Sequence, residues 1–352
     1  MTEKINLDCK YYKGDIPCIY HKKYSVHCTD CQYYKKIDKK ILIIKLGAIG
    51  DVIRTTPILQ RLQEEYPHSQ IHWLTHSPEI LPDSFIDKIY KYNFNNTEIL
   101  KNTEFDISIN FDKDREACAL QNQIKATKKF GFRLLHGNCH PIDKKATSKW
   151  LTGLFDDLNL KNTSSYIQEI FEICGFMFNG EEYILDVKNQ NKFSLPSDKI
   201  IIGLNTGCGE RWKTRLWPED YWNQLAALLI KKRFFVLLLG GEREHEKNKR
   251  ISTASGAEYL GHFHLTDFID LMNQCRLIVT PVTMALHIAL ALKKQIILFN
   301  NIFNRYEFEL YGRGKIIEPP VECRGCFKNK CDKQCMELIK PEEVLKEIKD
   351  LI

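Results

Sequence analysis

No stretch of this 352-residue sequence is long and apolar enough to cross a membrane as a helix. The nearest run, residues 277–292, is short and contains Thr280, Pro281, Thr283 and His287. The first eight residues also lack the apolar core of a secretory signal. We therefore expect a cytoplasmic protein without a transmembrane segment.

Most of the chain carries little net charge. Of the formal charge of +6, the first 40 residues contribute +4, from nine Lys against five Asp and Glu, which leaves +2 for the rest. A nucleic-acid-binding protein would be more basic, so nucleic acid is not an expected partner. The basic arm is most simply a solvated charged segment, and its charge is also compatible with peripheral contact at the inner face of a membrane.

Cysteine is unusually abundant for a cytosolic chain, with 13 residues. The odd number and the scattered positions do not indicate a secreted disulfide framework. Residues 1–40 form a separate Cys-rich arm, in which Cys28 and Cys31 have the two-residue spacing of metal-binding knuckles. Two interpretations remain open, a zinc-bound arm and reduced, partly buried thiols. The set is Cys9, Cys18, Cys28 and Cys31, with His21 and His27 among them.

The stretch 41–59 is the most informative in the chain. Residues 41–44 are all aliphatic and predict a strand buried on both faces. Gly47 and Gly50 then allow a sharp turn and a close approach to a ligand. Asp51 follows, where a helix is expected to begin. Its carboxylate either caps that helix or stands at the carboxyl end of a parallel strand, the usual ligand edge of such sheets.

Strands and helices alternate from Ile41 onward, which predicts parallel sheets with helices on both faces. We expect two α/β domains, 41–185 and 186–352, with the boundary near 183–196. Glycines and a proline in residues 126–185 predict loops, which make this region a candidate for an acceptor site. The expected strands are 41–46, 70–75, 87–92, 105–111, 200–205, 234–239, 277–280 and 295–299, and the expected helices are 51–66, 115–125, 217–232, 283–292 and 341–352.

Two aspartates follow the expected strand 105–111. Asp112 and Asp114 stand at its carboxyl end, just before the expected helix 115–125. Capping that helix is the simplest role for them, and lining a ligand cleft is the alternative.

The stretch 41–59 closely resembles the first strand–loop–helix unit of the glycosyltransferase family 9 heptosyltransferases. Lys45, Leu46, Gly50, Asp51, Thr55, Pro57 and Leu59 match the family pattern in order. A second segment, residues 205–218, resembles the family's glycine-rich motif, and Arg215 falls where the family has its phosphate-binding lysine. The glycines free backbone N–H groups for phosphate oxygens, and Thr206 and Thr214 can donate hydroxyl hydrogen bonds.

Residues 280–289 resemble a third family motif, in which Thr283 and His287 match. Val282 stands where the family has Asp, and Met284 where it has Gly. The absent carboxylate would have accepted hydrogen bonds from sugar hydroxyls. Either the donor sugar differs, or the activity is weakened or absent.

The resemblance covers about residues 41–350 and implies the GT-B fold, an α/β architecture in which two doubly wound Rossmann-like domains face a cleft. It implies an inverting glycosyltransferase that uses no metal for catalysis. Asp51 would accept the proton of an acceptor hydroxyl, while Arg215 and Thr283 would stabilise the leaving nucleoside diphosphate. By family precedent the donor is ADP-heptose, and the acceptor is a glycan, a lipopolysaccharide core or a protein. The predicted donor-binding residues are Gly47, Gly50, Thr206, Gly207, Thr214, Arg215, Thr283 and His287.

A second group of cysteines lies near the C-terminus, in the loop 323–335. Cys323 and Cys326 form a C-x-x-C pair, and Cys331 and Cys335 follow closely. Four thiolates at this spacing can surround one tetrahedral ion, so we expect a structural zinc or iron site, with free thiols or labile disulfides as the alternative. A branch of the family is known for a four-cysteine iron site, which this loop resembles in arrangement.

Two competing functions remain. A dinucleotide-dependent oxidoreductase is disfavoured, because residues 47–51 lack the G-x-G-x-x-G spacing and no acidic residue ends the second strand. A nucleotide-sugar sensor or scaffold subunit with a degenerate donor site is the non-enzymatic alternative. The intact Asp51 and Arg215 favour catalysis.

Overall fold

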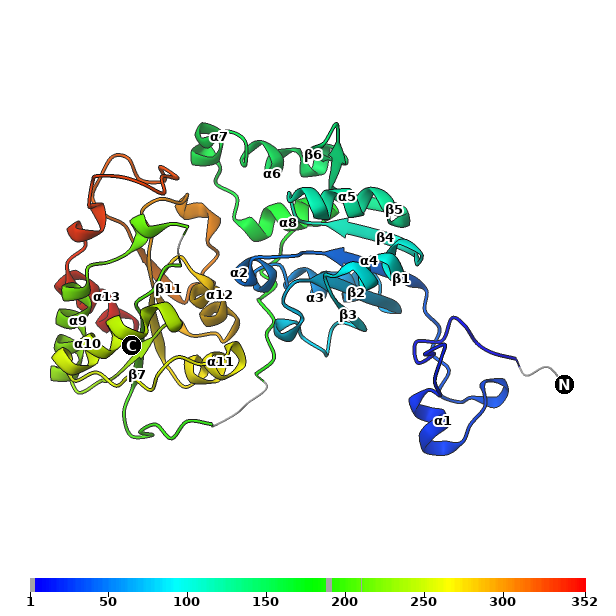
Figure 1. Ribbon diagram of the computed structural model, residues 1–352, viewed down its shortest axis with the longest axis horizontal. Helices are drawn as coiled ribbons and strands as arrows, with labels where there is room; N and C mark the ends of the chain where they lie inside the picture. The colour runs from blue at the N-terminus through cyan, green and yellow to red at the C-terminus, as the bar shows by residue number, and fades with distance from the viewer. Residues whose placement is uncertain (1–3, 188–191, 210) are drawn as a thin grey trace. The chain divides into compact units, whose positions relative to one another are not determined.

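The computed structural model describes residues 4–187, 192–209 and 211–352, which form two compact units that each contain one sheet (Figure 1). The first unit comprises Met1–Leu46, Ile58–Pro78 and Asp83–Ile142, and the second comprises Gly47–Pro57, Glu79–Pro82 and Asp143–Ile352.

The sheet of the first unit has the strand order β3-β2-β1-β4-β5-β6, and only β6 is antiparallel to its neighbour. Residues 41–44 of β1 are completely buried, as expected of a strand covered on both faces. The helices α4 (Phe94–Lys101) and α5 (Arg115–Gln123) belong to this unit. The strands are β1 (Lys39–Ile44), β2 (Ser69–Thr75), β3 (Lys88–Lys91), β4 (Glu104–Asn110), β5 (Lys125–Leu135) and β6 (Asn138–Pro141).

The strand order reverses between β1 and β4, which is the point where ligands commonly bind in open α/β sheets. Lys45, just after β1, forms a buried ion pair with Asp112, just after β4, and the Leu46 N–H donates to the same carboxylate. Burial raises the pKa of Asp112 against the opposing charge of Lys45. The simplest prediction for Asp112 is therefore wrong, because its carboxylate joins two strands. Asp114 is the residue that precedes α5, without a capping hydrogen bond from its side chain to the described residues.

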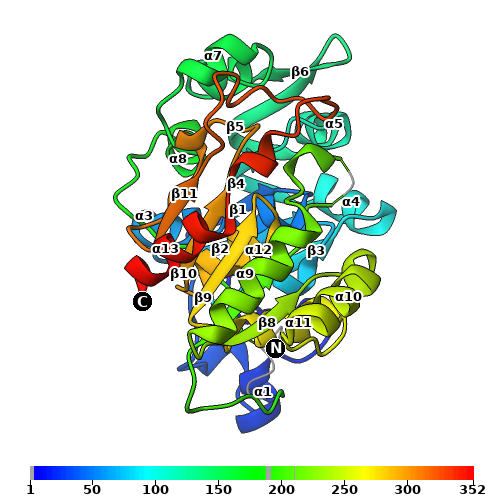
Figure 2. The same cartoon turned by 90° about the vertical axis from the view of Figure 1, so that its left-hand side faces the viewer.

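The sheet of the second unit is entirely parallel, with the order β11-β10-β9-β7-β8. Its strands are β7 (Ile201–Asn205), β8 (Phe235–Leu239), β9 (Leu277–Pro281), β10 (Gln295–Phe299) and β11 (Gly314–Ile317). The helices are α9 (Glu219–Lys231), α10 (His245–Ser255), α11 (Leu265–Asn273), α12 (Met284–Ala291) and α13 (Pro341–Leu351). Helices α9 and α13 pack side by side over the sheet (Figure 2), where Trp217, Trp222 and Phe299 fill the core.

The expected helix 51–66 is wrong as a single element. The chain forms α2 (Ile49–Ile53) and α3 (Ile58–Glu65), with a turn between them. Pro57 has no N–H with which to continue the first helix. The hydroxyls of Thr55 and Thr56 instead donate to the carbonyls of Asp51 and Ile53, which satisfies the end of α2.

The prediction of loops between residues 126 and 185 is only partly right, because Gly131 and Pro141 lie in strands, whereas Gly153 lies in a turn and residues 176–185 lie outside helices and strands. Strands β5 and β6 form a hairpin whose two turn residues, His136 and Gly137, have φ values of 48° and 77°. Both values are positive, which suits a tight hairpin turn. Three helices follow, α6 (Thr147–Leu151), α7 (Asp156–Lys161) and α8 (Tyr166–Cys174). Glycine in this region can also end a regular element, since α8 ends at Gly175 with a φ of 77°.

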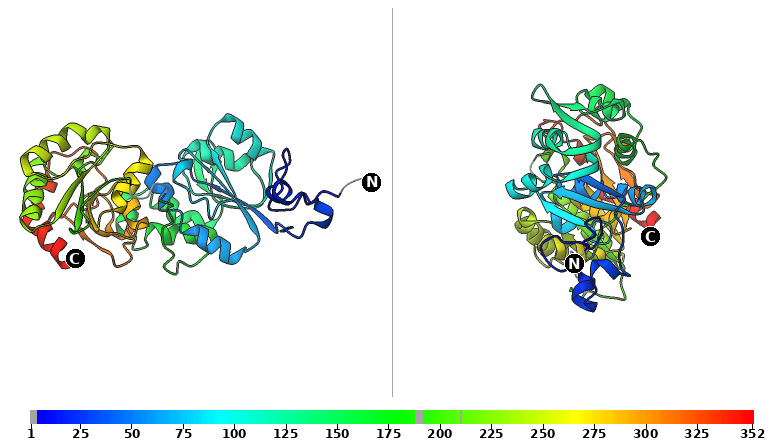
Figure 3. Two further views of the ribbon diagram at one scale, coloured as in Figure 1. Left: turned by 90° about the horizontal axis from the view of Figure 1, so that it is seen from below. Right: turned by 90° about the vertical axis from the view of Figure 1, so that its right-hand side faces the viewer.

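The remaining features are the domain boundary and the N-terminal arm. The predicted boundary near 183–196 lies between β6 and β7 and includes residues 188–191, which are outside the described residues. The arm contains the short helix α1 (Ile19–Tyr24) and leads into β1 (Figure 3). Across the described part of the chain, every helix is too short or too polar to traverse a bilayer.

Candidate functional site

Asp51 lies in the third position of α2, where neighbouring groups hold both of its carboxylate oxygens. Oδ1 is 2.8 Å from Nη2 of Arg54, and Oδ2 accepts a hydrogen bond of 3.3 Å from the Ala48 N–H. The side chain of Asp51 is 35% exposed, whereas that of Arg54 is only 13% exposed. Arg54 and the Ala48 N–H thus orient the carboxylate from its buried side, and a ligand can reach it from the solvent side.

Arg54 connects Asp51 to a residue far away in the sequence. Its Nη1 donates to Oε1 of Glu307 at 2.9 Å, and its guanidinium carbon lies 3.5 Å from the centre of the Tyr166 ring. Burial lowers the pKa of Arg54, but the charges of Asp51 and Glu307 raise it by more, so the net shift is upward. A permanent cation therefore stands beside the Asp51 carboxylate.

Gly50 brings α2 into direct contact with α12. A Cβ atom at Gly50 would lie 2.7 Å from Cδ2 of His287 and 3.4 Å from Cα of Met284. Any side chain at this position would therefore push the two helices apart. The contact explains the glycine and places Asp51 near the start of α12.

His287 is the side chain that packs against Gly50. Its ring stacks on Tyr183 with 6.1 Å between centres, and burial together with the charge of Arg54 lowers its pKa to about 3. The imidazole is therefore neutral at ordinary pH. Its buried Nδ1 lacks a hydrogen-bond partner among the described residues, so it can still serve a ligand.

The N-terminus of α12 stands at the point where the strand order of the second sheet reverses. Thr283 caps the helix, because its Oγ1 accepts a hydrogen bond of 3.2 Å from the Ala285 N–H. The Asn205 amide, at the end of β7, donates to Thr280 Oγ1 at 2.9 Å and to Thr283 Oγ1 at 3.2 Å. The ends of β7 and β9 thus meet at a helix N-terminus, which suits an anionic ligand.

Arg215 is buried, and burial lowers its pKa to about 10. Its guanidinium donates to the carbonyls of Val282 and Cys208, and Nε donates to the Trp212 carbonyl at 3.3 Å. An arginine side chain has five N–H donors, so these three bonds leave capacity for a ligand. In this structure Arg215 joins the glycine-rich loop to the loop before α12.

The structure does not bring all the predicted donor-binding residues together at one site, because several of them contact other parts of the protein. The Thr206 hydroxyl is buried and donates to Asn248 Oδ1 at 2.6 Å, and the Thr214 hydroxyl donates to the Lys328 carbonyl at 2.8 Å. Gly207 is closely approached by Glu244, whose Cδ would lie 2.4 Å from a Cβ atom at this position. Gly47 lies in the loop between β1 and α2.

Sequence reasoning missed Arg54, Glu307 and Glu244. The pairing of Arg54 with Asp51 could have been predicted from the sequence, because a residue three positions after Asp51 lies on the same face of a helix. The other two gave no local signal, since Glu307 is 253 residues from Arg54 and the contact of Glu244 with Gly207 joins residues far apart in the sequence.

The predicted metal site in the loop 323–335 is not assembled in this structure. Within the described residues, no group of three or more His, Cys, Asp and Glu side chains is arranged to hold an ion. Asn301 fastens the loop, because its backbone carbonyl accepts from Gly325 N–H at 2.9 Å and its amide donates to Cys335 Sγ at 3.3 Å. The thiols suit zinc or iron chemically, and the site stays a prediction.

Comparison with known proteins gives one family. The sequence model of glycosyltransferase family 9 (heptosyltransferase) matches residues 179–336. Lipopolysaccharide heptosyltransferase 2 of Escherichia coli is 30% identical over 114 residues, which are 30% of this chain and 32% of that protein. That match thus spans about a third of the relative's length. Lipopolysaccharide heptosyltransferase 1 of Campylobacter coli is 22% identical over 347 residues, which are 89% of this chain and 98% of that protein.

A solved structure shares the fold. The glycosyltransferase family 9 protein of Veillonella parvula superposes with a TM-score of 0.68 at 19% identity, and the match covers 90% of this chain and 97% of that one. The expected GT-B-type fold, with two Rossmann-like sheets, is thereby confirmed.

Proposed function

We propose that this chain, whose residues 179–336 match the glycosyltransferase family 9 model, transfers a sugar from a nucleoside diphosphate donor to a glycan hydroxyl in lipopolysaccharide synthesis. The contact between α2 and α12 carries this proposal. It brings an oriented carboxylate, Asp51, close to an anion-binding helix N-terminus, capped by Thr283.

Asp51 is the proposed general base. The acceptor hydroxyl gives its proton to the exposed part of this carboxylate, and its oxygen attacks the anomeric carbon of the donor sugar. The bond from that carbon to the diphosphate breaks with inversion of configuration. Arg54 orients the base through its 2.8 Å ion pair, and Glu307 holds Arg54 in turn.

The second half of the step is stabilisation of the leaving diphosphate. Thr283 and the first N–H groups of α12 face the reversal point of the sheet, where a phosphate would gain from the helix dipole. Arg215, which bonds the Val282 carbonyl just before α12, supplies the positive charge. We propose no metal for catalysis, because Arg215 and α12 already offset the developing negative charge.

The choice of sugar depends on Val282. Its apolar side chain is 8% exposed and cannot accept the hydrogen bonds that a carboxylate would take from sugar hydroxyls. Heptose is the sugar that the names of the two relatives suggest, and ADP-heptose is the donor that the family resemblance implies. We propose that this chain prefers another nucleotide-linked sugar.

The test is a panel of nucleotide-sugars, first by thermal shift and then by turnover with glycan acceptors. A bound donor raises the melting temperature, and a transferase releases nucleoside diphosphate only when an acceptor is present. Clear preference for ADP-heptose would refute the role of Val282. Binding without turnover for every acceptor would favour the sensor or scaffold alternative.

A further inference from the structure

The N-terminal arm has a defined backbone but little core. None of residues 4–40 is fully buried. The two ends of the arm are nevertheless paired, because the Lys10 N–H donates to the Lys35 carbonyl and the Ile37 N–H to the Asp8 carbonyl, both at 2.8 Å. A segment this small that cannot bury apolar surface generally needs a disulfide or a metal to stay folded.

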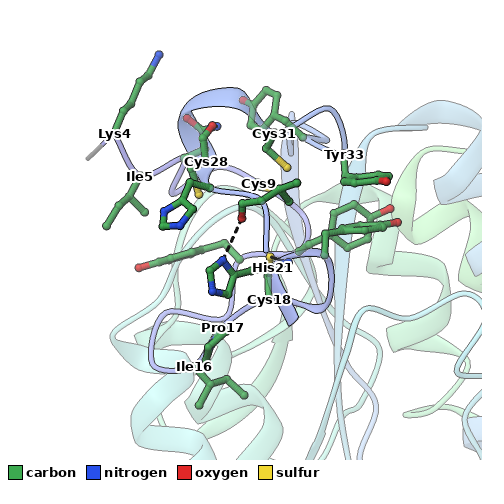
Figure 4. Close-up of a pocket in the computed structure, with 17 residues that line it drawn as sticks. Lys4, Ile5, Cys9, Ile16, Pro17, Cys18, His21, Cys28, Cys31 and Tyr33 are labelled. Carbon is green, nitrogen blue, oxygen red and sulfur yellow. Dashed lines mark hydrogen bonds between the residues drawn. The ribbon is translucent and has the colours of Figure 1, made fainter. Parts of the chain in front are cut away.

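The interior of the arm is a cavity of about 260 Å³ whose wall includes thiols and imidazoles (Figure 4). Tyrosines form part of its wall, with Tyr20 stacked on Tyr33 at 4.2 Å between ring centres. The soft donors that line it come from all parts of the arm and are Cys9, Cys18, Cys28, Cys31, His21 and His27. Residues up to 22 positions apart in the sequence thus converge on one space.

Local structure already orients several of these donors. Cys18 caps α1, and its Sγ accepts a hydrogen bond of 3.4 Å from the His21 N–H, which is a contact that stabilises a thiolate. Cys28 and Cys31 lie at the two ends of the 3₁₀ turn Cys28–Asp30, and the Asn6 amide fastens the Cys28 carbonyl at 3.1 Å. His21 Nδ1 donates to the Val26 carbonyl at 3.0 Å, which fixes the orientation of its ring.

We propose that this arm is a structural zinc module, in which the thiolates of Cys9, Cys18, Cys28 and Cys31 bind one Zn²⁺. His21 is a positioning residue that holds α1 at the edge of the site. Within the described residues these donors are not yet grouped around an ion, so binding draws the walls of the cavity together. Metal uptake is therefore coupled to the final folding of the arm.

The protons and charges of the proposed zinc site can be accounted for. Each thiol loses its proton to solvent on binding, so four thiolates and one Zn²⁺ leave a local charge of about −2. The surplus of lysine in the arm, including Lys22 and Lys23 in the last turn of α1, offsets this charge. Four protein ligands leave no open coordination position, so the ion supports structure and not the sugar transfer.

The arm belongs to the first unit and contacts the rest of it. Lys10 forms an ion pair of 2.7 Å with Asp87, which precedes β3, and the Asp38 N–H donates to the His68 carbonyl before β2. Loss of the ion should therefore loosen residues 4–38 and leave the sheet of the first unit intact.

The experiment uses the full chain, purified with a reductant and without a chelator, in a Cys323→Ser/Cys326→Ser background that disrupts the other cysteine group by removing its C-x-x-C pair. We expect about one zinc per chain by elemental analysis. Adding Cys28→Ser/Cys31→Ser should abolish zinc binding and make residues 4–38 sensitive to limited proteolysis. The matched control is Cys139→Ser, a half-buried cysteine outside both groups, which should keep the zinc.

Two further variants test the ligand set. Cys9→Ser should lose the zinc, whereas His21→Gln should keep it and bind it more weakly. Unchanged zinc content after Cys28→Ser/Cys31→Ser overturns the proposal. Iron in place of zinc, disulfides among the arm cysteines, or loss of zinc in His21→Gln but not in Cys9→Ser would each overturn it as well.

Discussion

At the scale of single residues, the site depends on charges that are held by neighbours. Asp51 is oriented by Arg54, which Glu307 holds in turn, and Arg215 is anchored to the carbonyls of Cys208 and Val282. A charged group fixed in this way loses little entropy when a ligand arrives, which favours both binding and catalysis. Two predictions follow from these contacts.

The first prediction concerns the proposed base. Asp51→Asn keeps the size of the side chain but cannot accept a proton, so turnover should fall by about 10²–10⁴-fold while donor affinity is largely kept. Steady-state kinetics and donor titration measure the two effects. Asp157→Asn, on the exposed face of α7, is the control. Turnover near that of the parent in Asp51→Asn would exclude the base role.

The second prediction concerns the diphosphate. Arg215→Ala removes charged hydrogen bonds worth about 1.5–3 kcal/mol, so affinity for the nucleoside diphosphate should fall by roughly 10–100-fold. Affinity for the free nucleoside should change less, because the nucleoside lacks the phosphates. Isothermal titration gives both constants. Arg211→Ala, a nearby exposed arginine, should bind normally, and equal losses for the two ligands would argue against a phosphate contact.

At the scale of elements, two short helices determine the site. α2 and α12 touch at Gly50, and both begin close to a strand end. A substitution at Thr283 should affect α12 directly. Thr283 caps this helix, and its hydroxyl oxygen also accepts a hydrogen bond from the Asn205 amide at the end of β7. Its cap can therefore be tested separately from the chemistry.

The third prediction is that Thr283→Ala lowers the free energy of unfolding by about 0.5–2 kcal/mol, the usual effect of losing a helix cap. Thr283→Ser retains the hydroxyl and should stay within a few tenths of the parent. Urea unfolding measures both variants. If Ala and Ser behave alike, the cap does not stabilise α12.

At the scale of the whole molecule, each unit contains a buried imidazole that should remain neutral. Burial and the charges of Lys88 and Lys40 lower the pKa of His72 in the first unit to about 3, and His287 in the second unit has a pKa of about 3. Unfolding releases both imidazoles to water, where they titrate near 6.5. The unfolded chain therefore binds more protons between about pH 6.5 and 3.

The fourth prediction is that stability falls as the pH falls through this window. The sign follows from linkage, because the state that binds more protons gains as the pH falls. Each imidazole contributes roughly 1.4 kcal/mol per pH unit, or about 2 kcal/mol at pH 5. His72→Phe should reduce the difference in urea stability between pH 7 and pH 5, whereas His68→Gln, on the surface, should not. Identical pH dependence in both variants would contradict the assignment to His72.

The sequence by itself determined the α/β class, the expected strands, and the positions of Asp51, Arg215 and Thr283. These features are local, because buried strands, glycine turns and helix starts depend on residues close together in the chain. The expected strand 41–46 and the helix that follows Thr283 correspond closely to β1 and α12.

Only the tertiary structure decided which of these residues act together. It joined Arg54 to Glu307 and Lys45 to Asp112, turned Thr206 and Thr214 to other partners, and broke the expected helix 51–66 at Pro57. It also brought the cysteines of the arm around one cavity. Such contacts form between residues distant in sequence, and their geometry follows from packing and strand order, which no local pattern records.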